Sequence, residues 1–277
     1  MYRGAALKQA TVLGASGYIG SRLAGRLRGT GWDVLTPSRD SPALYKAPLG
    51  VVYYCSGMTA NFMLDEQATV FAHVGYLQKI LRGADFKRII YLSSCRLYDA
   101  RAGQQCREDD ALQLTPRSPR HLYDLSKALG ENLCLNYSKG RGSVARLACV
   151  YDESAQAGGF LPDLLRRLRS EGSFVLDSAS GFSRDYISLD DVLEGLIALG
   201  SLGIAGLTVN LSSGKNVTNG ELVDLINSHG YSLSLARESE AAPAPVCVNE
   251  RMREQLLVTP STLQDWLSRY FHKLSGG

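Results

Sequence analysis

A tyrosine and a lysine four residues apart are the residues of this chain whose types and spacing could move a proton. Tyr123 and Lys127 fall on a predicted helix, so their side chains share one face of it. Free tyrosine is a poor base at neutral pH, because its pKa is about 10, but a neighbouring ammonium favours the phenolate. Tyr123 could then remove a proton from a substrate hydroxyl, or return one to a carbonyl oxygen, while a hydride moves at the same carbon.

Ser94 offers a third polar group for the same chemistry. It lies just past the end of a predicted strand, where ligands bind in parallel α/β sheets, and its hydroxyl could hydrogen-bond the same substrate oxygen. Ser93 competes with it for this role. A tyrosine four residues before a lysine is common on amphipathic helices, so the pair alone carries little weight. Its combination with a strand-end serine and a glycine turn points to hydride transfer.

The glycine turn lies near the start of the sequence, between a predicted strand and a predicted helix. Gly14, Gly17 and Gly20 form a Gly-x-x-Gly-x-x-Gly motif, in which the glycines allow a tight turn, approach of the backbone to a pyrophosphate, and packing of the helix on the strand. The helix N-terminus adds N–H donors and partial positive charge. We expect a dinucleotide to contact Gly14, Ser16, Gly17, Tyr18, Ile19 and Gly20.

The end of the second predicted strand favours NADP over NAD. An acidic residue at this point usually binds the ribose 2′-hydroxyl of NAD. Here the sequence reads Thr-Pro-Ser-Arg at 36–39, with no carboxylate before Asp40. Ser38 and Arg39 could instead hold a 2′-phosphate. The alternative is that Arg39 is an ordinary solvated charge.

Composition and charge exclude several other classes of protein. The 277 residues are 45% hydrophobic and carry a net charge of +3 from 30 basic and 27 acidic residues, which does not indicate a nucleic-acid surface. With no secretory signal and no apolar stretch of about 20 residues, we expect a cytoplasmic protein without a membrane span. The six cysteines form no Cys-x-x-Cys pair and the four histidines show no ligand spacing, so we expect reduced thiols and no metal site.

Predicted strands and helices alternate through the first half of the chain, as is typical of a parallel, doubly wound sheet. The strands are expected at 10–13, 33–36, 51–55, 89–92 and 144–150, and the helices at 17–28, at 65–82 and from Pro119. We therefore predict an α/β, Rossmann-like dinucleotide-binding domain over residues 1–151. Residues 152–277 form a small substrate lobe, of which about 188–212 returns to the core. In this lobe, Ser188–Asp191 and Thr218–Glu221 are predicted capping boxes, and the last helix is expected at 260–271.

Several segments together carry a family resemblance. They read Gly-Ala-Ser-Gly-Tyr-Ile-Gly at 14–20, Val-Val-Tyr-Tyr-Cys-Ser-Gly at 51–57, Tyr-Leu-Ser-Ser-Cys-Arg-Leu-Tyr at 91–98, Tyr-Asp-Leu-Ser-Lys at 123–127 with Gly130-Glu131, and Arg-Asp-Tyr-Ile-Ser-Leu-Asp-Asp at 184–191. With them the chain resembles an extended short-chain dehydrogenase/reductase of the NAD-dependent epimerase/dehydratase family, whose members work largely on nucleotide sugars.

The resemblance implies roles for further residues. Ser94, four residues before Tyr98, corresponds to the catalytic serine or threonine, and Cys55, Ser56, Gly57 and Lys127 correspond to residues beside the cofactor. Arg184 corresponds to an arginine that often contacts the substrate diphosphate; its alternative is a surface ion pair with Asp185 or Glu153. Thr59 follows the cofactor-side strand in Met58-Thr59-Ala60, so it could hydrogen-bond substrate or simply cap a turn.

The chain also departs from the family pattern. Cys95-Arg96 stand where the sugar-nucleotide dehydratases carry Asp-Glu, which disfavours 4,6-dehydration. Cys149 stands where an asparagine often meets the diphosphate. The span from Arg39 to Val51 is too short for the usual further strand and helix, so one strand after the second is expected to be missing or minimal.

These observations predict an NAD(P)-dependent enzyme, either an epimerase that oxidises and re-reduces a nucleotide-sugar-like substrate or an NADPH-dependent ketoreductase that works on a non-sugar substrate. A third hypothesis is an NAD(P)-binding protein without catalysis, although the presence of both Tyr123 and Lys127 speaks against it. The expected partner is a small molecule. A homodimer through the helices at 65–82 and 119–139, including Tyr76, is a further hypothesis.

Overall fold

The computed structural model describes residues 8–59, 62–154, 158–240 and 243–275. Contacts along the backbone divide these residues into two compact units. The first comprises the described residues up to Leu97 together with Leu114–Arg146 and Leu193–Val209. The second comprises Tyr98–Gln113, Leu147–Val192 and the described residues from Asn210 onward. Each unit is thus assembled from segments that are distant in sequence.

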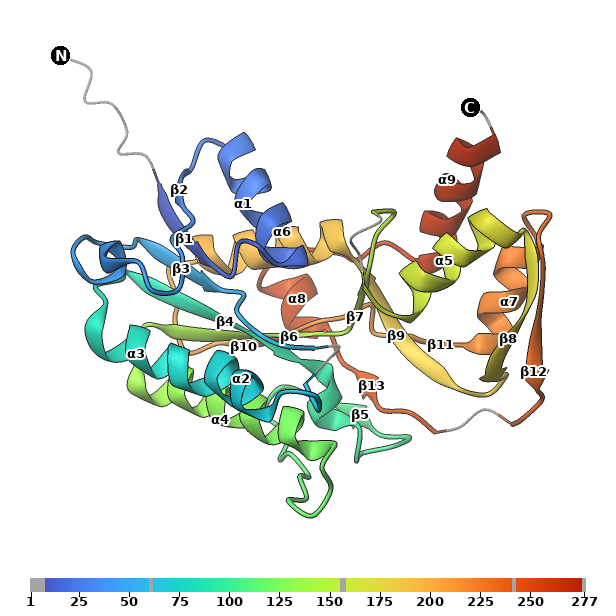
Figure 1. Cartoon of the computed structure of the whole chain (residues 1–277), viewed down its shortest axis with the longest axis horizontal. Coiled ribbons are helices and arrows are strands. Elements are labelled where there is room, and N and C mark those ends of the chain that lie inside the picture. Colours follow the sequence, from blue (N-terminus) through green and yellow to red (C-terminus); the bar gives the residue numbers. More distant parts are fainter. Residues whose placement is uncertain (1–7, 60–61, 155–157, 241–242, 276–277) are drawn as a thin grey trace. The chain divides into compact units, whose positions relative to one another are not determined.

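A six-stranded sheet with the strand order β10-β6-β4-β3-β1-β2 forms the centre of the first unit (Figure 1). β1 pairs in parallel with β2 and β3, and β3 pairs in parallel with β4. The strands are β1 (Gln9–Leu13), β2 (Asp33–Leu35), β3 (Val51–Tyr54), β4 (Arg88–Ser94), β6 (Gly142–Leu147) and β10 (Thr208–Leu211).

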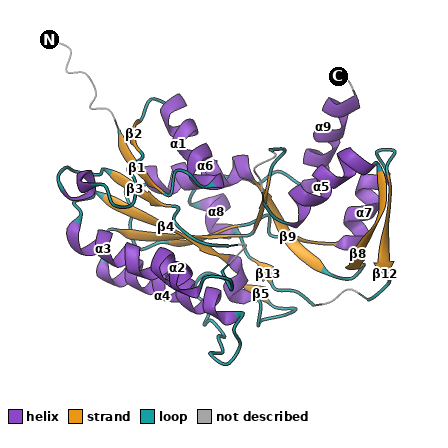
Figure 2. Ribbon diagram, in the orientation of Figure 1, coloured by secondary structure: helices purple, strands orange, loops and turns teal. Residues whose placement is uncertain are grey.

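Helices cover both faces of this sheet, as the ribbon in Figure 2 also shows. One face carries α1 (Tyr18–Gly29) and α6 (Leu189–Ser201), and the other carries α2 (Glu66–Val70), α3 (Tyr76–Gly83) and α4 (His121–Tyr137). All residues of β3 are buried, as expected for a strand between two layers of helices. The predicted doubly wound, Rossmann-like α/β fold is confirmed.

The expected loss of one strand is also confirmed. Between β2 and β3 the chain forms only a 3₁₀ turn, Pro42–Tyr45, and β2 is the edge strand of the sheet. Ser41 begins this turn, and its side chain accepts a hydrogen bond from the backbone N–H of Ala43. The link between β2 and β3 is therefore too short to contribute a further strand beyond β2.

The long helix predicted at 65–82 is interrupted by a π-helical turn, Phe71–Gly75, between α2 and α3. Asp65 caps the start of α2 by accepting a hydrogen bond from the N–H of Ala68. The side chains of α3 that face the sheet join a core that includes Tyr54 and Tyr91, whose rings stack with centroids 5.6 Å apart. Tyr76 is only 2% exposed in this core, so the expectation that it reaches a partner subunit is wrong. The homodimer itself stays a prediction.

The second unit contains three small sheets and four helices within the residues that the structure describes. β11 (Asn216–Thr218), β9 (Ser183–Ser188) and β7 (Cys149–Tyr151) form one sheet, β12 (Ser232–Arg237) pairs with β8 (Ser173–Ala179), and β13 (Val246–Cys247) pairs with β5 (Gln105–Cys106). The helices are α5 (Phe160–Glu171), α7 (Asn219–Asn227), α8 (Glu250–Glu254) and α9 (Leu263–Ser275). Apolar side chains from α5, α7 and α9 meet in one core.

Sequence motifs predicted the starts of two helices correctly but predicted the strand boundaries less well. Thr218 and Glu221 make both hydrogen bonds of a capping box, and the Ser188 hydroxyl accepts from the N–H of Asp191, as predicted. The single strand expected at 144–150 is wrong, because the chain leaves one sheet at Leu147 and enters another at Cys149. Across the described residues, the structure holds no helix with the length and apolar character needed to span a membrane.

Candidate active site

The glycine turn between β1 and α1 has the geometry that a bound diphosphate requires. Gly14 adopts a φ of +84°, and a Cβ on it would lie 2.8 Å from the backbone nitrogen of Ser56. A Cβ on Gly20 would lie 2.3 Å from the carbonyl oxygen of Gly14. Larger residues are therefore excluded at both positions, because each would collide with backbone. The turn lies against the segment that follows β3, and α1 packs closely on the turn at Gly20.

The start of α1 offers backbone donors to an anion. Its N-cap residue, Gly17, has no side chain to bond these N–H groups, and the first turn holds no acidic residue. Both features suit a diphosphate at the positive end of the helix dipole. Of the other predicted contact residues, Ser16 is exposed, while Tyr18 and Ile19 are half-buried. The residues present thus fit a dinucleotide.

The segment that follows β3 connects this turn to the predicted catalytic helix. The N–H of Cys55 donates to the carbonyl of Leu13 at 2.8 Å, which holds the segment beside the glycine turn. A Cβ on Gly57 would lie 3.2 Å from the Lys127 ammonium nitrogen. The structure therefore brings Cys55, Ser56 and Gly57 between the predicted diphosphate turn and Lys127, and their role beside a cofactor stays a prediction.

Lys127 is fixed by its own hydrogen bond and is buried. Its ammonium donates to the carbonyl oxygen of Leu92 at 2.8 Å and lies 5.9 Å from the centre of the Tyr123 ring. Burial lowers the pKa of Lys127 to about 8, against the opposing effects of Glu131 and Cys55. The side chain is consequently protonated at neutral pH and loses its charge as the pH rises through about 8.

Tyr123 is enclosed by aromatic rings and one guanidinium. Its ring lies 5.3 Å from that of Phe62, 5.3 Å from that of His73 in an edge contact, and 4.7 Å from the guanidinium carbon of Arg96. The backbone N–H of Arg96 donates to the Ser94 hydroxyl oxygen at 3.2 Å. Arg96 thus touches both predicted proton-handling residues. The competing Ser93 hydroxyl is buried and makes no hydrogen bond within the residues described, so the choice between the two serines stays a prediction.

His73 is a site residue that the sequence reasoning missed. It is fully buried on the π-helical turn and receives a hydrogen bond at Nε2 from the backbone N–H of Met58 at 3.2 Å. Its Nδ1 lies 2.7 Å from the Ser126 hydroxyl, which donates to the carbonyl of Tyr123. Burial, with a contribution from Lys127, lowers the pKa of His73 to about 3, so the ring is neutral. Its contacts assign the proton to Nδ1.

The residues predicted to read the ribose follow β2 and are exposed. The Arg39 guanidinium lies 5.6 Å from the Phe71 ring and 5.7 Å from the Tyr76 ring, so it packs against the π-helical turn and the start of α3. Ser38 accepts a backbone hydrogen bond from Ser41. The preference for NADP over NAD therefore stays a prediction.

The two predicted substrate contacts, Thr59 and Arg184, lie in different units of the chain. Thr59 is exposed, and Ala60 lies outside the described residues. Arg184 belongs to the second unit, where its guanidinium packs over the Phe182 ring at 4.1 Å. Neither alternative ion pair forms among the residues described, because Ser213 and Gly214 bond Asp185 while Lys273 pairs with Glu153. The role of Arg184 in substrate binding stays a prediction.

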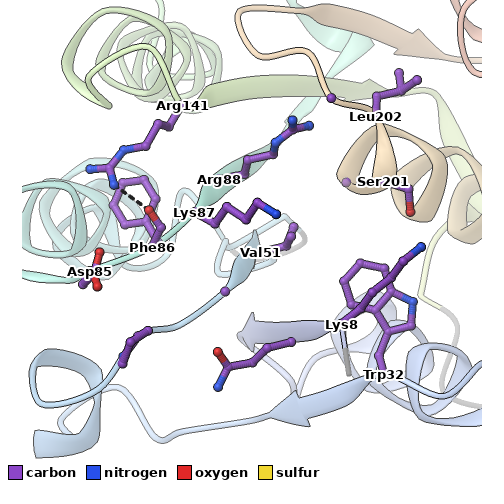
Figure 3. Close-up of a pocket in the computed structure, with 15 residues that line it drawn as sticks. Lys8, Trp32, Val51, Asp85, Phe86, Lys87, Arg88, Arg141, Ser201 and Leu202 are labelled. Atoms are coloured by element: carbon purple, nitrogen blue, oxygen red, sulfur yellow. Dashed lines mark hydrogen bonds between the residues drawn. The ribbon is translucent and has the colours of Figure 1, made fainter. Parts of the chain in front are cut away.

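A cavity of about 840 Å³ lies at the opposite ends of the strands (Figure 3). It is lined by residues at the amino ends of β1, β3 and β4, including Gln9, Val51 and Arg88. Two of its arginines are already bound to backbone carbonyls, Arg141 to Phe86 at 2.6 Å and Arg88 to Ile204 at 3.3 Å. Ligands of parallel α/β sheets bind at the carboxyl ends of the strands, so this cavity is not at the end of the sheet where a ligand is expected.

Solved structures support the fold. The chain is similar to MoeE5 in complex with UDP-glucose and NAD, with a TM-score of 0.80 and 19% identity over 97% of this chain and 100% of that one. It is similar to RMD from Pseudomonas aeruginosa complexed with NADPH, with a TM-score of 0.74 and 23% identity over 95% and 97%. It is also similar to UDP-glucuronic acid 4-epimerase from Bacillus cereus in complex with UDP-glucuronic acid and NAD, with a TM-score of 0.75 and 18% identity over 96% and 99%.

Sequence comparison gives the family. No curated protein matches the chain. The model of the NAD dependent epimerase/dehydratase family matches residues 44–211, which is more than half of the 277 residues and includes Ser94, Tyr123 and Lys127. The chain therefore belongs to the NAD-dependent epimerase/dehydratase family.

Proposed function

We propose that the chain is an NAD(P)-dependent epimerase or reductase that acts at a hydroxyl or keto carbon of a nucleotide-sugar-like substrate. The observation that carries the proposal is the cluster of Tyr123, Lys127 and Gly57 beside the glycine turn, with the Lys127 nitrogen 5.9 Å from the Tyr123 ring. Solved structures of the same fold that hold UDP-glucose, UDP-glucuronic acid or UDP-N-acetylmuramic acid support a nucleotide-sugar substrate.

Tyr123 acts as the acid and base. Its hydroxyl takes the proton from a substrate hydroxyl during oxidation and gives it back to the carbonyl oxygen during reduction. A nicotinamide coenzyme held at the glycine turn would supply the hydride chemistry. Two cations, Lys127 and Arg96, lie within 6 Å of the Tyr123 ring centre and favour the anionic phenolate. Ser94 hydrogen-bonds the same substrate oxygen and holds it at Tyr123.

The same residues serve an epimerase and a reductase, so the coenzyme distinguishes them. A reductase exchanges its coenzyme after each turnover, and NADPH bound to RMD supports this alternative for the fold. An epimerase keeps its coenzyme, and NAD is present with UDP-glucose in MoeE5. Mass analysis of the coenzyme retained on purification, followed by titration with NADH and NADPH, tests the proposal. Tightly retained NAD supports the epimerase, readily exchanged NADPH supports the reductase, and failure to bind either coenzyme contradicts both.

Replacing Arg39 by alanine tests the expected NADP preference. We expect the dissociation constant for NADPH to rise about tenfold or more, because a charge-assisted hydrogen bond to the 2′-phosphate contributes about 1.5–3 kcal/mol. NADH is the matched control ligand, because it lacks this phosphate, and its binding to Arg39→Ala should be unchanged. Fluorescence titration of both coenzymes measures the effect. A parallel loss for NADH and NADPH would show that Arg39 serves the local packing with Phe71 and Tyr76 instead.

A further inference from the structure

Arg96 stands beside the proposed proton-handling residues, and its charge could serve the substrate as well as the Tyr123 phenolate. Its backbone N–H bonds the Ser94 hydroxyl at 3.2 Å, and its guanidinium carbon lies 4.7 Å from the Tyr123 ring centre and 5.2 Å from that of Phe62. The backbone of Arg96 is thus bonded to Ser94, and its guanidinium packs against two neighbouring rings. The guanidinium therefore lies over the ring whose hydroxyl is proposed to meet the substrate oxygen.

The charge of Arg96 is only loosely compensated within the protein. Its nearest carboxylate oxygen, on Asp124, lies 4.0 Å from Nε, at the outer limit of an ion pair. Within the residues that the structure describes, the terminal nitrogens of Arg96 donate no hydrogen bond, and 32% of the side chain is exposed. A guanidinium whose terminal nitrogens are not engaged by the protein is suited to bidentate binding of a carboxylate.

We propose that Arg96 binds a carboxylate that the substrate carries on the carbon next to the one that reacts. The inference rests on the proposed function and specifies its substrate as an acidic sugar. The guanidinium carbon lies 4.7 Å from the Tyr123 ring centre, so an anionic group bound by Arg96 would be close, within the substrate, to the oxygen that meets Tyr123. A neutral hydroxymethyl group at the same position would leave the guanidinium without its partner.

Two substrates that differ only in this group test the inference. UDP-glucuronic acid carries a carboxylate where UDP-glucose carries a hydroxymethyl group. We expect the coenzyme-loaded protein to bind and turn over UDP-glucuronic acid at least about tenfold better than UDP-glucose, because charge-assisted hydrogen bonds contribute about 1.5–3 kcal/mol. Arg96→Gln should abolish this preference through the KM for the acid. Arg96→Lys should restore part of it, since an ammonium keeps the charge but loses the fork.

The outcomes separate the inference from the proposed function. Equal binding of the two sugars by the unaltered protein, or an equal loss of binding for both in Arg96→Gln, overturns the carboxylate assignment while the epimerase or reductase stands. Calorimetry of binding gives this answer even where turnover is slow. Failure of both sugars to bind contradicts the nucleotide-sugar substrate itself, and the carboxylate assignment with it.

A second inference comes from the buried imidazole of His73. The structure assigns His73 as a positioning residue for Tyr123, because it is hydrogen-bonded both to the segment after β3 and to the helix that carries Tyr123. One ring nitrogen accepts from Met58, and the other donates to Ser126, which in turn bonds the Tyr123 carbonyl. The ring also packs edge-on against Tyr123. One neutral side chain therefore couples the cofactor-side loop to α4.

Two partial mimics of the imidazole test this role. His73→Phe retains an aromatic ring and loses both hydrogen bonds, so we expect kcat to fall about tenfold or more through misplacement of Tyr123. His73→Asn can still donate toward Ser126 and should recover much of kcat, whereas Ser126→Ala should reproduce the loss. Thermal unfolding provides the control. A fall in stability with kcat unchanged in the folded fraction, or no recovery in His73→Asn, would reduce His73 to a packing residue.

Discussion

Replacing Tyr123 by phenylalanine is expected to lower kcat by about 10²- to 10⁴-fold while coenzyme binding persists, because the change removes a general acid and base. We expect this substitution to leave the packing around the ring unchanged. The rings of Phe62 and His73 and the Arg96 guanidinium all contact the aromatic ring of Tyr123, and a phenylalanine retains that ring. Only the hydroxyl is lost.

A tyrosine on the same helix provides the matched control. Tyr137 is 64% exposed at the end of α4, so Tyr137→Phe should leave kcat, coenzyme binding and thermal unfolding unchanged. Turnover of a nucleotide sugar, together with titration of NADH and NADPH, measures both variants. Normal turnover by Tyr123→Phe would remove Tyr123 from the mechanism. Loss of coenzyme binding along with turnover would instead indicate a disturbed helix.

The parts of the fold that short sequence motifs determine were predictable. The glycine turn specifies its own conformation, because Gly14 has a positive φ and Gly20 lies against the Gly14 carbonyl. The missing strand followed from the length of the link between β2 and β3 alone. Capping at Thr218 is equally local, since it involves residues within one turn of helix. In each case the deciding contacts lie between residues close in sequence.

The parts that depend on distant contacts were not predictable. The hydrogen bond between His73 and Ser126 joins residues 53 positions apart, and the π-helical turn that carries His73 interrupts an otherwise ordinary amphipathic pattern. The division of the strand expected at 144–150 is set by its partners, because β7 pairs with β9 in a separate sheet. The placement of Arg96 over Tyr123 likewise arises only when β4 and α4 come together.

The Gly130-Glu131 pair after the Tyr-x-x-x-Lys motif has a structural explanation. A Cβ on Gly130 would lie 2.2 Å from the Tyr91 hydroxyl oxygen, so this position requires glycine. Glu131 forms two hydrogen bonds with the Arg146 guanidinium, at 2.9 and 2.7 Å, and both side chains are about 5% exposed. Glu131 thus joins α4 to β6, and Gly130 lets α4 approach Tyr91 of β4. They place the helix that carries Tyr123 on the sheet without touching the reacting groups.

Replacing Glu131 by glutamine is accordingly expected to destabilise the first unit by about 3–5 kcal/mol, because it leaves the Arg146 charge buried without its counterion. Urea unfolding of the first unit measures the change. Trp32 belongs to that unit and Trp266 to the other, so a Trp266→Phe background lets tryptophan fluorescence report on Trp32 alone. Glu171→Gln is the matched control, since it breaks an ion pair with Arg167 whose side chains are 44% and 45% exposed, and it should change the urea midpoint little.

A double variant separates the cost of an unpaired charge from the value of the pair. Exchange of Glu131 for leucine together with Arg146 for methionine removes both charges at once, and apolar replacements of buried pairs are often neutral or stabilising. We therefore expect the double variant to be more stable than Glu131→Gln. If Glu131→Gln unfolds at the same urea concentration as the unaltered protein, water must reach Arg146, and the pair does not anchor α4. If the double variant is as unstable as the single one, the hydrogen bonds themselves, and not the buried charge, hold α4 to β6.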